Sequence, residues 1–159
     1  MKNIITPCLW FDTEAEEAAN LYTSVFKNSR IDHISRYNKE GKEIHGKDSG
    51  TVMTVNFTIN GQPFVALNGG PLFQFNEAVS FQIFCDTQEE IDHYWNSLTK
   101  DGGQESQCGW LKDKYGVSWQ VIPSMLGELM SVPDKAEKIT KTFLQMKKID
   151  INVLEQAGR

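Results

Sequence analysis

Two stretches of this sequence follow one pattern: LWFDTEAEEAANLYTSVF at residues 9–26 and IFCDTQEEIDHYWNSL at residues 83–98. Each stretch runs from apolar residues into Asp-Thr, then into acidic residues, and then into an amphipathic segment that contains aromatic residues. Such a recurrence indicates an internal repeat, and a repeat determines the architecture of the whole chain. The sequence therefore predicts two copies of one structural unit.

Each copy predicts a strand, a helix cap and a helix. The strands are predicted at residues 6–11 and 79–85. Asp12-Thr13 and Asp86-Thr87 are predicted to cap the helices, because their side-chain oxygens can accept hydrogen bonds from free backbone N–H groups. Apolar residues at helical spacing predict one buried face on each helix. They are Ala15, Ala18, Ala19, Tyr22 and Phe26 in the first copy, and Ile91, Tyr94, Trp95 and Leu98 in the second.

Strand-like segments follow each predicted helix. In the first half they are residues 31–36, 51–59 and 64–68, with Asn60-Gly61 as a hairpin turn. In the second half they are residues 107–111 and 117–122, on either side of a turn at 113–116. The predicted order is β-α-β-β-β, twice.

The remaining segments predict a loop, a connection and a helical tail. Residues 38–50 form a glycine-containing charged loop, and residues 69–78 connect the halves. We predict a single domain over residues 1–159, with a first module at 1–70, a second at 78–123 and a C-terminal helical extension at 124–159. The amphipathic segments of this extension must dock on their own sheet or on a partner subunit.

The composition excludes several classes of partner. Acidic residues number 21 and basic residues 16, and no basic patch interrupts the net charge of −5, so a nucleic-acid partner is not expected. No apolar run approaches the roughly 20 residues of a membrane span, so we expect a cytoplasmic protein without a membrane partner. Cys8, Cys85 and Cys108 are too widely spaced for a metal-binding motif and are expected to be reduced thiols.

Three further strings carry a family resemblance: NGGPLFQFNEAVSF at 68–81, GWLKDKYGVSWQVIP at 109–123 and QMKKIDINVLEQA at 145–157. With the duplicated unit, they resemble the PhnB-like branch of the vicinal-oxygen-chelate superfamily, which includes glyoxalases, bleomycin-resistance proteins and extradiol dioxygenases. This branch is often called the 3-demethylubiquinone-9 3-methyltransferase family. The resemblance implies an α+β fold in which paired βαβββ modules form a cupped mixed sheet around a small-molecule cavity, usually within a homodimer.

The resemblance also implies where a metal ion would bind. Enzymes of the superfamily usually hold a divalent metal by His or Gln on the first strand of each module and by a carboxylate on the last. In this sequence those positions fall on Thr6, Ser80, Ala66 and Gln120, of which only Gln120 is a plausible donor. A shift by one residue does not improve the set, and His33, His45 and His93 lie far apart. We therefore predict no tightly held metal and no cofactor.

The methyltransferase name lacks support from a recognisable motif. Methyltransferases commonly bind the methyl donor at a glycine-rich turn from a strand into a helix. Gly69-Gly70 is instead followed by Pro71 and a predicted loop.

A ligand-binding pocket remains the best-supported kind of site. Alternate residues of the first strand of each module share one face. The amide of one residue on a later strand, one residue at a strand end and three aromatic residues near loops complete the predicted set. The predicted ligand-binding residues are Thr6, Cys8, Trp10, Asn68, Phe73, Phe75, Ser80, Gln82, Phe84, Trp110 and Gln120. Alternatives stay open: Trp10, Phe84 and Trp119 suit a core, Phe73 and Phe75 suit a dimer contact, and Lys112 suits a solvated turn better than an anion site.

Three functional hypotheses follow. The first is a PhnB-like homodimer that binds a small molecule without a tightly held metal. The second is an enzyme, either metal-assisted or the methyltransferase of the family name, so catalytic activity stays open. The third is a structural or regulatory dimer whose cavity is filled by side chains.

Overall fold

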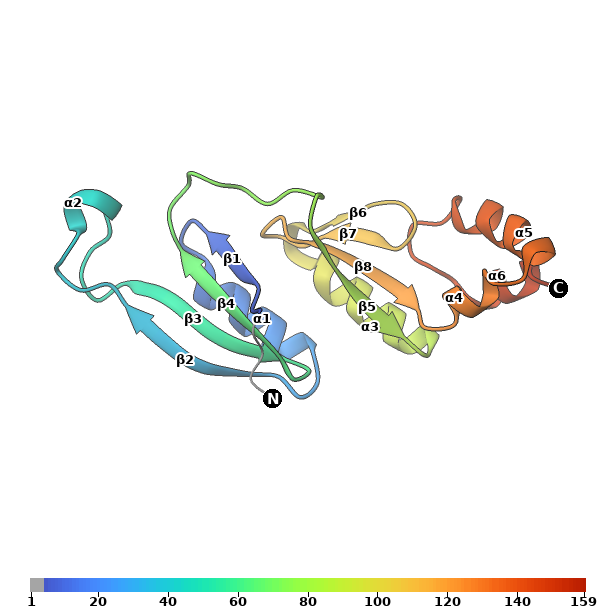
Figure 1. The fold of residues 1–159 in the computed structure, drawn as a ribbon, viewed down its shortest axis with the longest axis horizontal. Helices are drawn as coiled ribbons and strands as arrows, with labels where there is room; N and C mark the ends of the chain where they lie inside the picture. The colour runs from blue at the N-terminus through green and yellow to red at the C-terminus, as the bar shows by residue number, and fades with distance from the viewer. Residues whose placement is uncertain (1–4) are drawn as a thin grey trace. The chain divides into compact units, whose positions relative to one another are not determined.

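The computed structural model describes residues 5–159. The chain divides between Gln74 and Phe75 into two compact units, each with a four-stranded sheet and its own helices (Figure 1). The predicted α+β class and the repeated β-α-β-β-β order are both confirmed. The closing of the two sheets into one cup stays a prediction.

The first unit contains β1 (Cys8–Phe11), α1 (Ala15–Val25), β2 (Arg30–Arg36), α2 (Lys42–His45), β3 (Val52–Ile59) and β4 (Gln62–Asn68). Its sheet has the order β1-β4-β3-β2, with β1 parallel to β4 and the other neighbours antiparallel. The predicted apolar face of α1 is buried against one face of this sheet. The ring of Tyr22 stacks on Phe57 at 6.1 Å, and Phe57 stacks on Phe64 at 5.4 Å.

The hairpin between β3 and β4 forms as the sequence predicts. Asn60 and Gly61 have φ values of 44° and 83°, and Ile59 pairs with Gln62 across the turn. Left-handed backbone at both central residues is the requirement of the tight hairpin turn that Asn-Gly favours.

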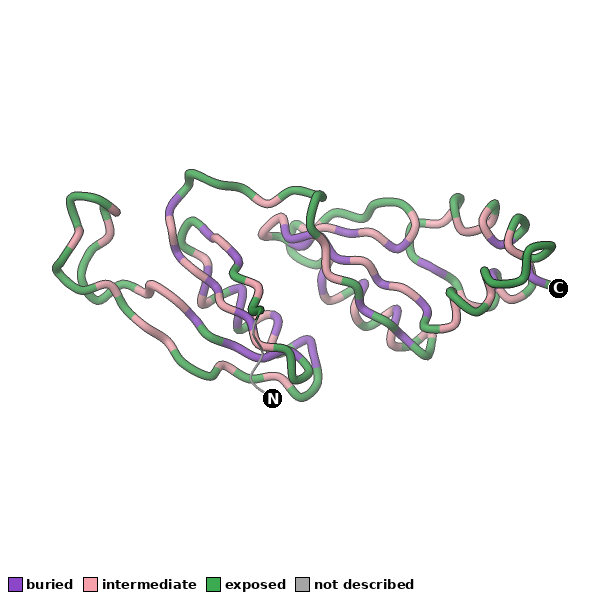
Figure 2. Tube along the Cα trace, viewed as in Figure 1, coloured by how far each residue is buried: buried purple, intermediate pink, exposed green. Residues whose placement is uncertain are grey.

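The second unit repeats the arrangement with β5 (Ser80–Cys85), α3 (Gln88–Thr99), a 3-10 turn (Lys100–Gly102), β6 (Gln104–Glu105), β7 (Trp110–Lys112) and β8 (Ser118–Pro123). The sheet order is β5-β8-β7-β6, and β5 runs parallel to β8. Buried residues gather where α3 meets the sheet, among them Ile91, Trp95 and Leu98 (Figure 2). The strand predicted at 107–111 is confirmed only in its second part, because β7 begins at Trp110 and the preceding strand, β6, ends at Glu105.

The capping predictions are right for one helix and wrong for the other. Thr87 is the N-cap of α3 and accepts a hydrogen bond from the Glu90 N–H, and the Glu90 carboxylate accepts one from the N–H of Asp86, the residue before the cap. In the first copy the N-cap position is Glu14, whose side chain makes no cap bond. The Ala15 N–H instead donates to Oδ1 of Asn68, which is far away in the sequence.

The C-terminal extension forms α4 (Leu126–Leu129), α5 (Pro133–Phe143) and α6 (Ile151–Ala157). Ile139 of α5 and Leu154 of α6 are fully buried, and the two helices pack together. The segment before α6 is held by its own unit, because the Cys108 and Gly109 N–H groups donate to the carbonyls of 146 and 147. In residues 5–159 no helix combines the length and apolar character that crossing a membrane requires.

Candidate functional site

Each sheet has one face covered by a helix and one face that we call its open face. Residues alternate between the two faces along each strand. The open face of the first sheet carries Cys8, Trp10, Thr54, Asn56, Val65 and Leu67. The open face of the second sheet carries Ser80, Gln82, Phe84, Trp110, Lys112, Ser118, Gln120 and Ile122.

The open face of the second sheet brings four predicted site residues together. Gln120 pairs in register with Gln82 on one side and with Trp110 on the other. Its amide nitrogen donates to Ser80 Oγ at 2.8 Å, and its amide oxygen accepts from the Gln82 amide at 3.4 Å. Two amides, a hydroxyl and an indole ring therefore lie side by side.

A hollow of about 140 Å3 lies beside this group. We call it the Ser118 hollow; it is lined by Glu77, Gln104, Glu105, Ser106, Trp110, Leu111, Lys112 and Ser118. Ser118 is only 1% exposed, and its Oγ has no hydrogen-bond partner among residues 5–159. The ammonium of Lys112 forms an ion pair with the Glu77 carboxylate, and this hydrogen bond holds the pKa of Glu77 below its ordinary value.

Several interpretations of single residues change at this site. Lys112 ends β7 and is half-buried and ion-paired, so the solvated turn is the wrong description. Phe84 is 64% exposed, so its interpretation as a core residue is also wrong. Trp119 is a core residue, and its indole N–H donates to Oδ2 of the buried Asp113 at 2.9 Å.

Sequence reasoning missed Ser118 and Glu77. Ser118 stands two residues before Gln120 on the same strand, so strand alternation already places both on one face. The lack of a partner for its hydroxyl is a property of the fold and has no sequence signal. Glu77 lies in the connection before β5, and only its ion pair with Lys112 assigns it to the hollow.

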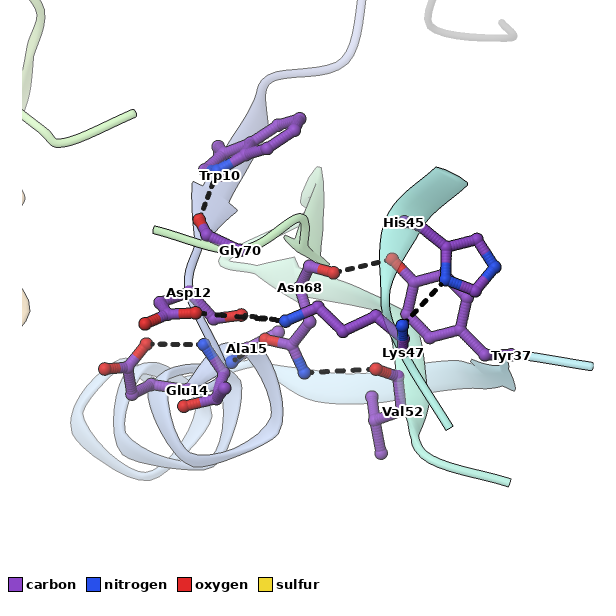
Figure 3. Close-up of polar contacts among 11 residues, drawn as sticks. Trp10, Asp12, Glu14, Ala15, Tyr37, His45, Lys47, Val52, Asn68 and Gly70 are labelled. Atoms are coloured by element: carbon purple, nitrogen blue, oxygen red, sulfur yellow. Dashed lines mark hydrogen bonds and ion pairs between the residues drawn. The ribbon is translucent and has the colours of Figure 1, made fainter. Parts of the chain in front are cut away.

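In the first unit the structure brings Trp10 and Phe73 together. The Trp10 indole N–H donates to the Gly70 carbonyl at 2.8 Å (Figure 3). The rings of Trp10 and Phe73 meet edge to face at 5.0 Å, and Phe73 remains 59% exposed. Gly69 lies flat against the indole, since a Cβ there would stand 2.2 Å from a ring carbon. The loop after β4 therefore fixes the orientation of Trp10.

Asn68 does not join this aromatic pair. It is buried, and its amide is used on the helix side, where Oδ1 accepts from the Ala15 N–H at 2.8 Å and Nδ2 donates to the Val52 carbonyl at 3.1 Å (Figure 3). The Tyr37 hydroxyl donates to the Asn68 carbonyl at 2.6 Å. These bonds tie together the ends of α1, β3 and β4. The Asn68 amide thus serves the fold.

A groove of about 480 Å3 lies next to Asn68 and is lined by Thr13, Glu16, Gly46, Lys47, Asp48, Thr51, Val52 and Asn68. The ammonium of Lys47 reaches the Asp12 carbonyl at 3.3 Å and its carboxylate at 3.8 Å (Figure 3). The ring of His45 lies 4.5 Å from that of Tyr37, and its Nδ1 accepts from the Lys47 N–H. These contacts hold the 38–50 loop by local bonds within it and, through Lys47, by bonds to Asp12 after β1.

The other predicted site residues lie apart from these groups. Thr6 is exposed and precedes β1, whereas Cys8 is exposed on the open face of the first sheet. Phe75 is half-buried and belongs to the second unit.

The positions that the family resemblance assigns to metal ligands need one correction. In the first unit Cys8 pairs with Val65, and at the equivalent place in the second unit Gln82 pairs with Gln120. The counterpart of Gln120 is therefore Val65, and the assignment of Ala66 is wrong by one residue because Ala66 is fully buried on the helix side.

The corrected donor set does not fit a tightly held transition metal. It consists of the hydroxyls of Thr6 and Ser80, the amide of Gln120 and the hydrocarbon side chain of Val65. Transition metals in proteins select imidazole, thiolate and carboxylate ligands. Over the described part of the chain, no three His, Cys, Asp or Glu side chains gather as a metal site would require.

Comparison with known proteins shows similarity along most of the chain. The family model described as 3-demethylubiquinone-9 3-methyltransferase matches residues 3–122, which leaves the C-terminal helices outside the match. No curated protein sequence matches the chain. A PhnB protein from Bacillus cereus is 39% identical, over 76% of this chain and 99% of that one, with a TM-score of 0.67.

Two more distant structures share the fold alone. Protein PA1353 from Pseudomonas aeruginosa is 17% identical over 77% of this chain and 98% of its own, with a TM-score of 0.60. The fosfomycin resistance protein FosX from Mesorhizobium loti is 12% identical over 77% and 91%, with a TM-score of 0.53.

Proposed function

The chain belongs to the 3-demethylubiquinone-9 3-methyltransferase family of PhnB-like, vicinal-oxygen-chelate proteins, and from this premise we propose that it binds a small organic molecule without a tightly held metal. The binding surface in this proposal is the open face of the second sheet. The observation that carries it is the group formed by Ser80, Gln82, Gln120 and Trp110 beside the Ser118 hollow.

The chemistry of this surface suits a ligand that is partly aromatic. Small-molecule sites are largely apolar and contain a few polar groups that fix orientation. Phe84 and Trp110 supply aromatic surface, and the amides of Gln82 and Gln120 can exchange their mutual hydrogen bond for bonds to a ligand. Phe84, at 64% exposure, leaves apolar surface in water that a bound ligand would cover.

Binding is favoured over methyl transfer by the residues of the chain. The glycine pair Gly69-Gly70 follows β4 and leads through an irregular connection to β5. A dinucleotide-type or methyl-donor site uses a glycine-rich turn that opens a helix, where backbone N–H groups point at the ligand. The connection from 69 to 79 contains no helix to supply them.

The test is a fragment screen by two-dimensional NMR on the intact protein. Aromatic fragments are expected to shift the resonances of Gln82, Gln120 and the Trp110 indole. Gln120→Leu should weaken the binding of those fragments, and Gln145→Leu, at an exposed position after α5, is the matched control. Fragments that bind only elsewhere would contradict the proposal. So would stoichiometric transition metal in protein purified after metal supplementation, or a rise in stability with S-adenosylmethionine.

We further propose that the protein acts as a homodimer, as the family resemblance implies. A dimer would have twice the 18.1 kDa mass of the chain in sedimentation equilibrium. A monomer at micromolar concentration would contradict this proposal and leave the binding proposal unchanged.

A further inference from the structure

The Ser118 hydroxyl identifies the chemistry that the hollow lacks. A buried hydroxyl without a partner gives up its hydrogen bonds to water and gains none in return. Such groups are rare in folded proteins, and a ligand that enters the hollow can supply the missing bond. We therefore expect a ligand to place a polar group over β8, where it can form a hydrogen bond with the Ser118 hydroxyl.

The charges around the hollow restrict that group. The ionisable residues that line it are Glu77, Glu105 and Lys112. Glu105 accepts a hydrogen bond from the Trp95 indole on the helix side, and Lys112 is paired with Glu77. An anion would compete with Glu77 for Lys112 and meet two carboxylates, whereas a cation would compete with Lys112 for Glu77.

A neutral group that both donates and accepts avoids both conflicts. An ammonium group has three donors, and a carboxylate has two acceptor oxygens. Lys112 can therefore donate one more hydrogen bond, and Glu77 can accept one more, while their ion pair stays intact. Lys112 and Ser118 are paired in register, which places their side chains next to each other on one face. A hydroxyl, a cation and an anion thus surround one small volume.

We propose that the Ser118 hollow binds a neutral carboxamide or an equivalent planar group of the ligand, which rests on the proposed function and names its ligand class. The carbonyl accepts from the Ser118 hydroxyl, and the NH2 group donates to Glu77. A volume of about 140 Å3 is close to the roughly 150 Å3 of a cavity that holds benzene. Trp110 lines the hollow and provides a flat surface for the ring that carries the amide.

Three isosteric probes test this assignment: benzamide, benzoate and benzamidine, which share a phenyl ring and differ in charge. Protein-observed NMR titration follows the amides of Lys112 and Ser118 and the Trp110 indole. Benzamide is expected to bind at least about 5-fold more tightly than either charged probe, the factor that one hydrogen bond of about 1 kcal/mol provides. Benzoate or benzamidine binding as tightly as benzamide would overturn the proposal.

Two variants locate the interaction. Ser118→Ala should weaken benzamide binding about 5-fold, whereas Ser124→Ala, an exposed serine just after β8, should leave it unchanged. Lys112→Met frees Glu77 and should reverse the preference, so that benzamidine binds more tightly than benzamide. Unchanged benzamide affinity in Ser118→Ala, or an unchanged order of probes in Lys112→Met, would contradict the assignment.

The failure of this inference differs from the failure of the proposed function. If fragments shift the resonances of Gln82 and Gln120 but no carboxamide fragment shifts the resonance of Ser118, the proposed ligand class is wrong. The proposal that the open face binds a small molecule then stands. If no fragment shifts any residue of the open face, both are overturned.

Discussion

Ser118 has opposite consequences for stability and for binding. Because its hydroxyl is buried without a partner, Ser118→Ala removes an unsatisfied group and should raise the free energy of unfolding of the free protein by about 1 kcal/mol. Urea denaturation of the variant and of Ser124→Ala as control measures the difference. A lower stability of Ser118→Ala would show that the hydroxyl is hydrogen-bonded in the folded protein, so that the hollow offers a ligand no unpaired hydroxyl.

Cys8 and Cys85 should differ in reactivity. Burial, and then the negative charges of Glu90 and Asp86, raise the pKa of Cys85 to about 12. The reactive thiolate is therefore almost absent at pH 8, and alkylation of the folded protein should label Cys8, on the open face, well before Cys85. Mass spectrometry of the labelled peptides gives both rates, and labelling in urea shows that each thiol can react. Equal rates in the folded protein would contradict the burial of Cys85.

Among the elements, α1 depends on a cap from outside its own segment. Asn68→Ala removes both the acceptor for the Ala15 N–H and the donor to the Val52 carbonyl. Loss of a cap and of a second buried hydrogen bond should lower the free energy of unfolding by about 2 kcal/mol. Asn56→Ala, an exposed asparagine on β3, is the matched control in the same denaturation experiment. An equal effect of both variants would contradict the capping role.

The attachment of the C-terminal tail to α3 should depend on pH. A hydrogen bond from Lys148, followed by one from Gln88, lowers the pKa of Asp92 from its ordinary value of 3.8. A carboxyl group whose pKa is lowered by folding stabilises the protein above its ordinary pKa, and this contribution is lost as the pH falls through the lowered value. Asp92→Asn should thus reduce Tm by roughly 2 °C at pH 7, and the difference between the two proteins should disappear as the pH falls through the lowered pKa of Asp92. A constant difference down to pH 2 would contradict a role of the charge.

Local patterns predicted the elements where the interactions are local. The Asn60-Gly61 turn, the buried face of α1 and the Thr87 cap each depend on residues within a few positions, and all three are confirmed. The cap of α1 comes from Asn68, which is distant in the sequence and reaches Ala15 only in the folded chain. The prediction that Asp12-Thr13 caps α1 is therefore wrong, and no local pattern could have identified Asn68. The strand predicted at 107–111 begins only at Trp110, because Cys108 takes a φ of 57° and its N–H donates to the carbonyl of 146.

At the scale of the whole molecule, the candidate site was partly visible in the sequence. Strand alternation placed Ser80, Gln82 and Phe84 on one face, and the structure agrees. The same alternation places Asn68 with Ala66 on the helix-covered face of the first sheet. Asn68 was included in the predicted site because it ends a strand, and not because it shares a face with the other site residues. The hollow is recognised as a site by the ion pair between Glu77 and Lys112 and by the Ser118 hydroxyl that lacks a hydrogen bond. Neither feature is encoded in a local sequence pattern.

The chain divides into two compact units, and we predict that a substitution in the core of one unit accelerates hydrogen exchange in that unit alone. Ile149 is 1% exposed and lies in the C-terminal tail of the second unit. It stands between residues 146 and 147, whose carbonyls accept hydrogen bonds from 108 and 109, and the first residue of α6. Ile149→Ala should cost about 3 kcal/mol by loss of buried surface and formation of a cavity. Hydrogen exchange should then accelerate in α3, β7 and α6 and stay unchanged in α1 and β3, because Ile149 contacts Gln88 and Gly109 of its own unit and a weakened core opens locally. Val153→Ala, an exposed apolar residue of α6, should have no such effect and serves as the control. Faster exchange in α1 and β3 of the Ile149 variant would contradict this prediction.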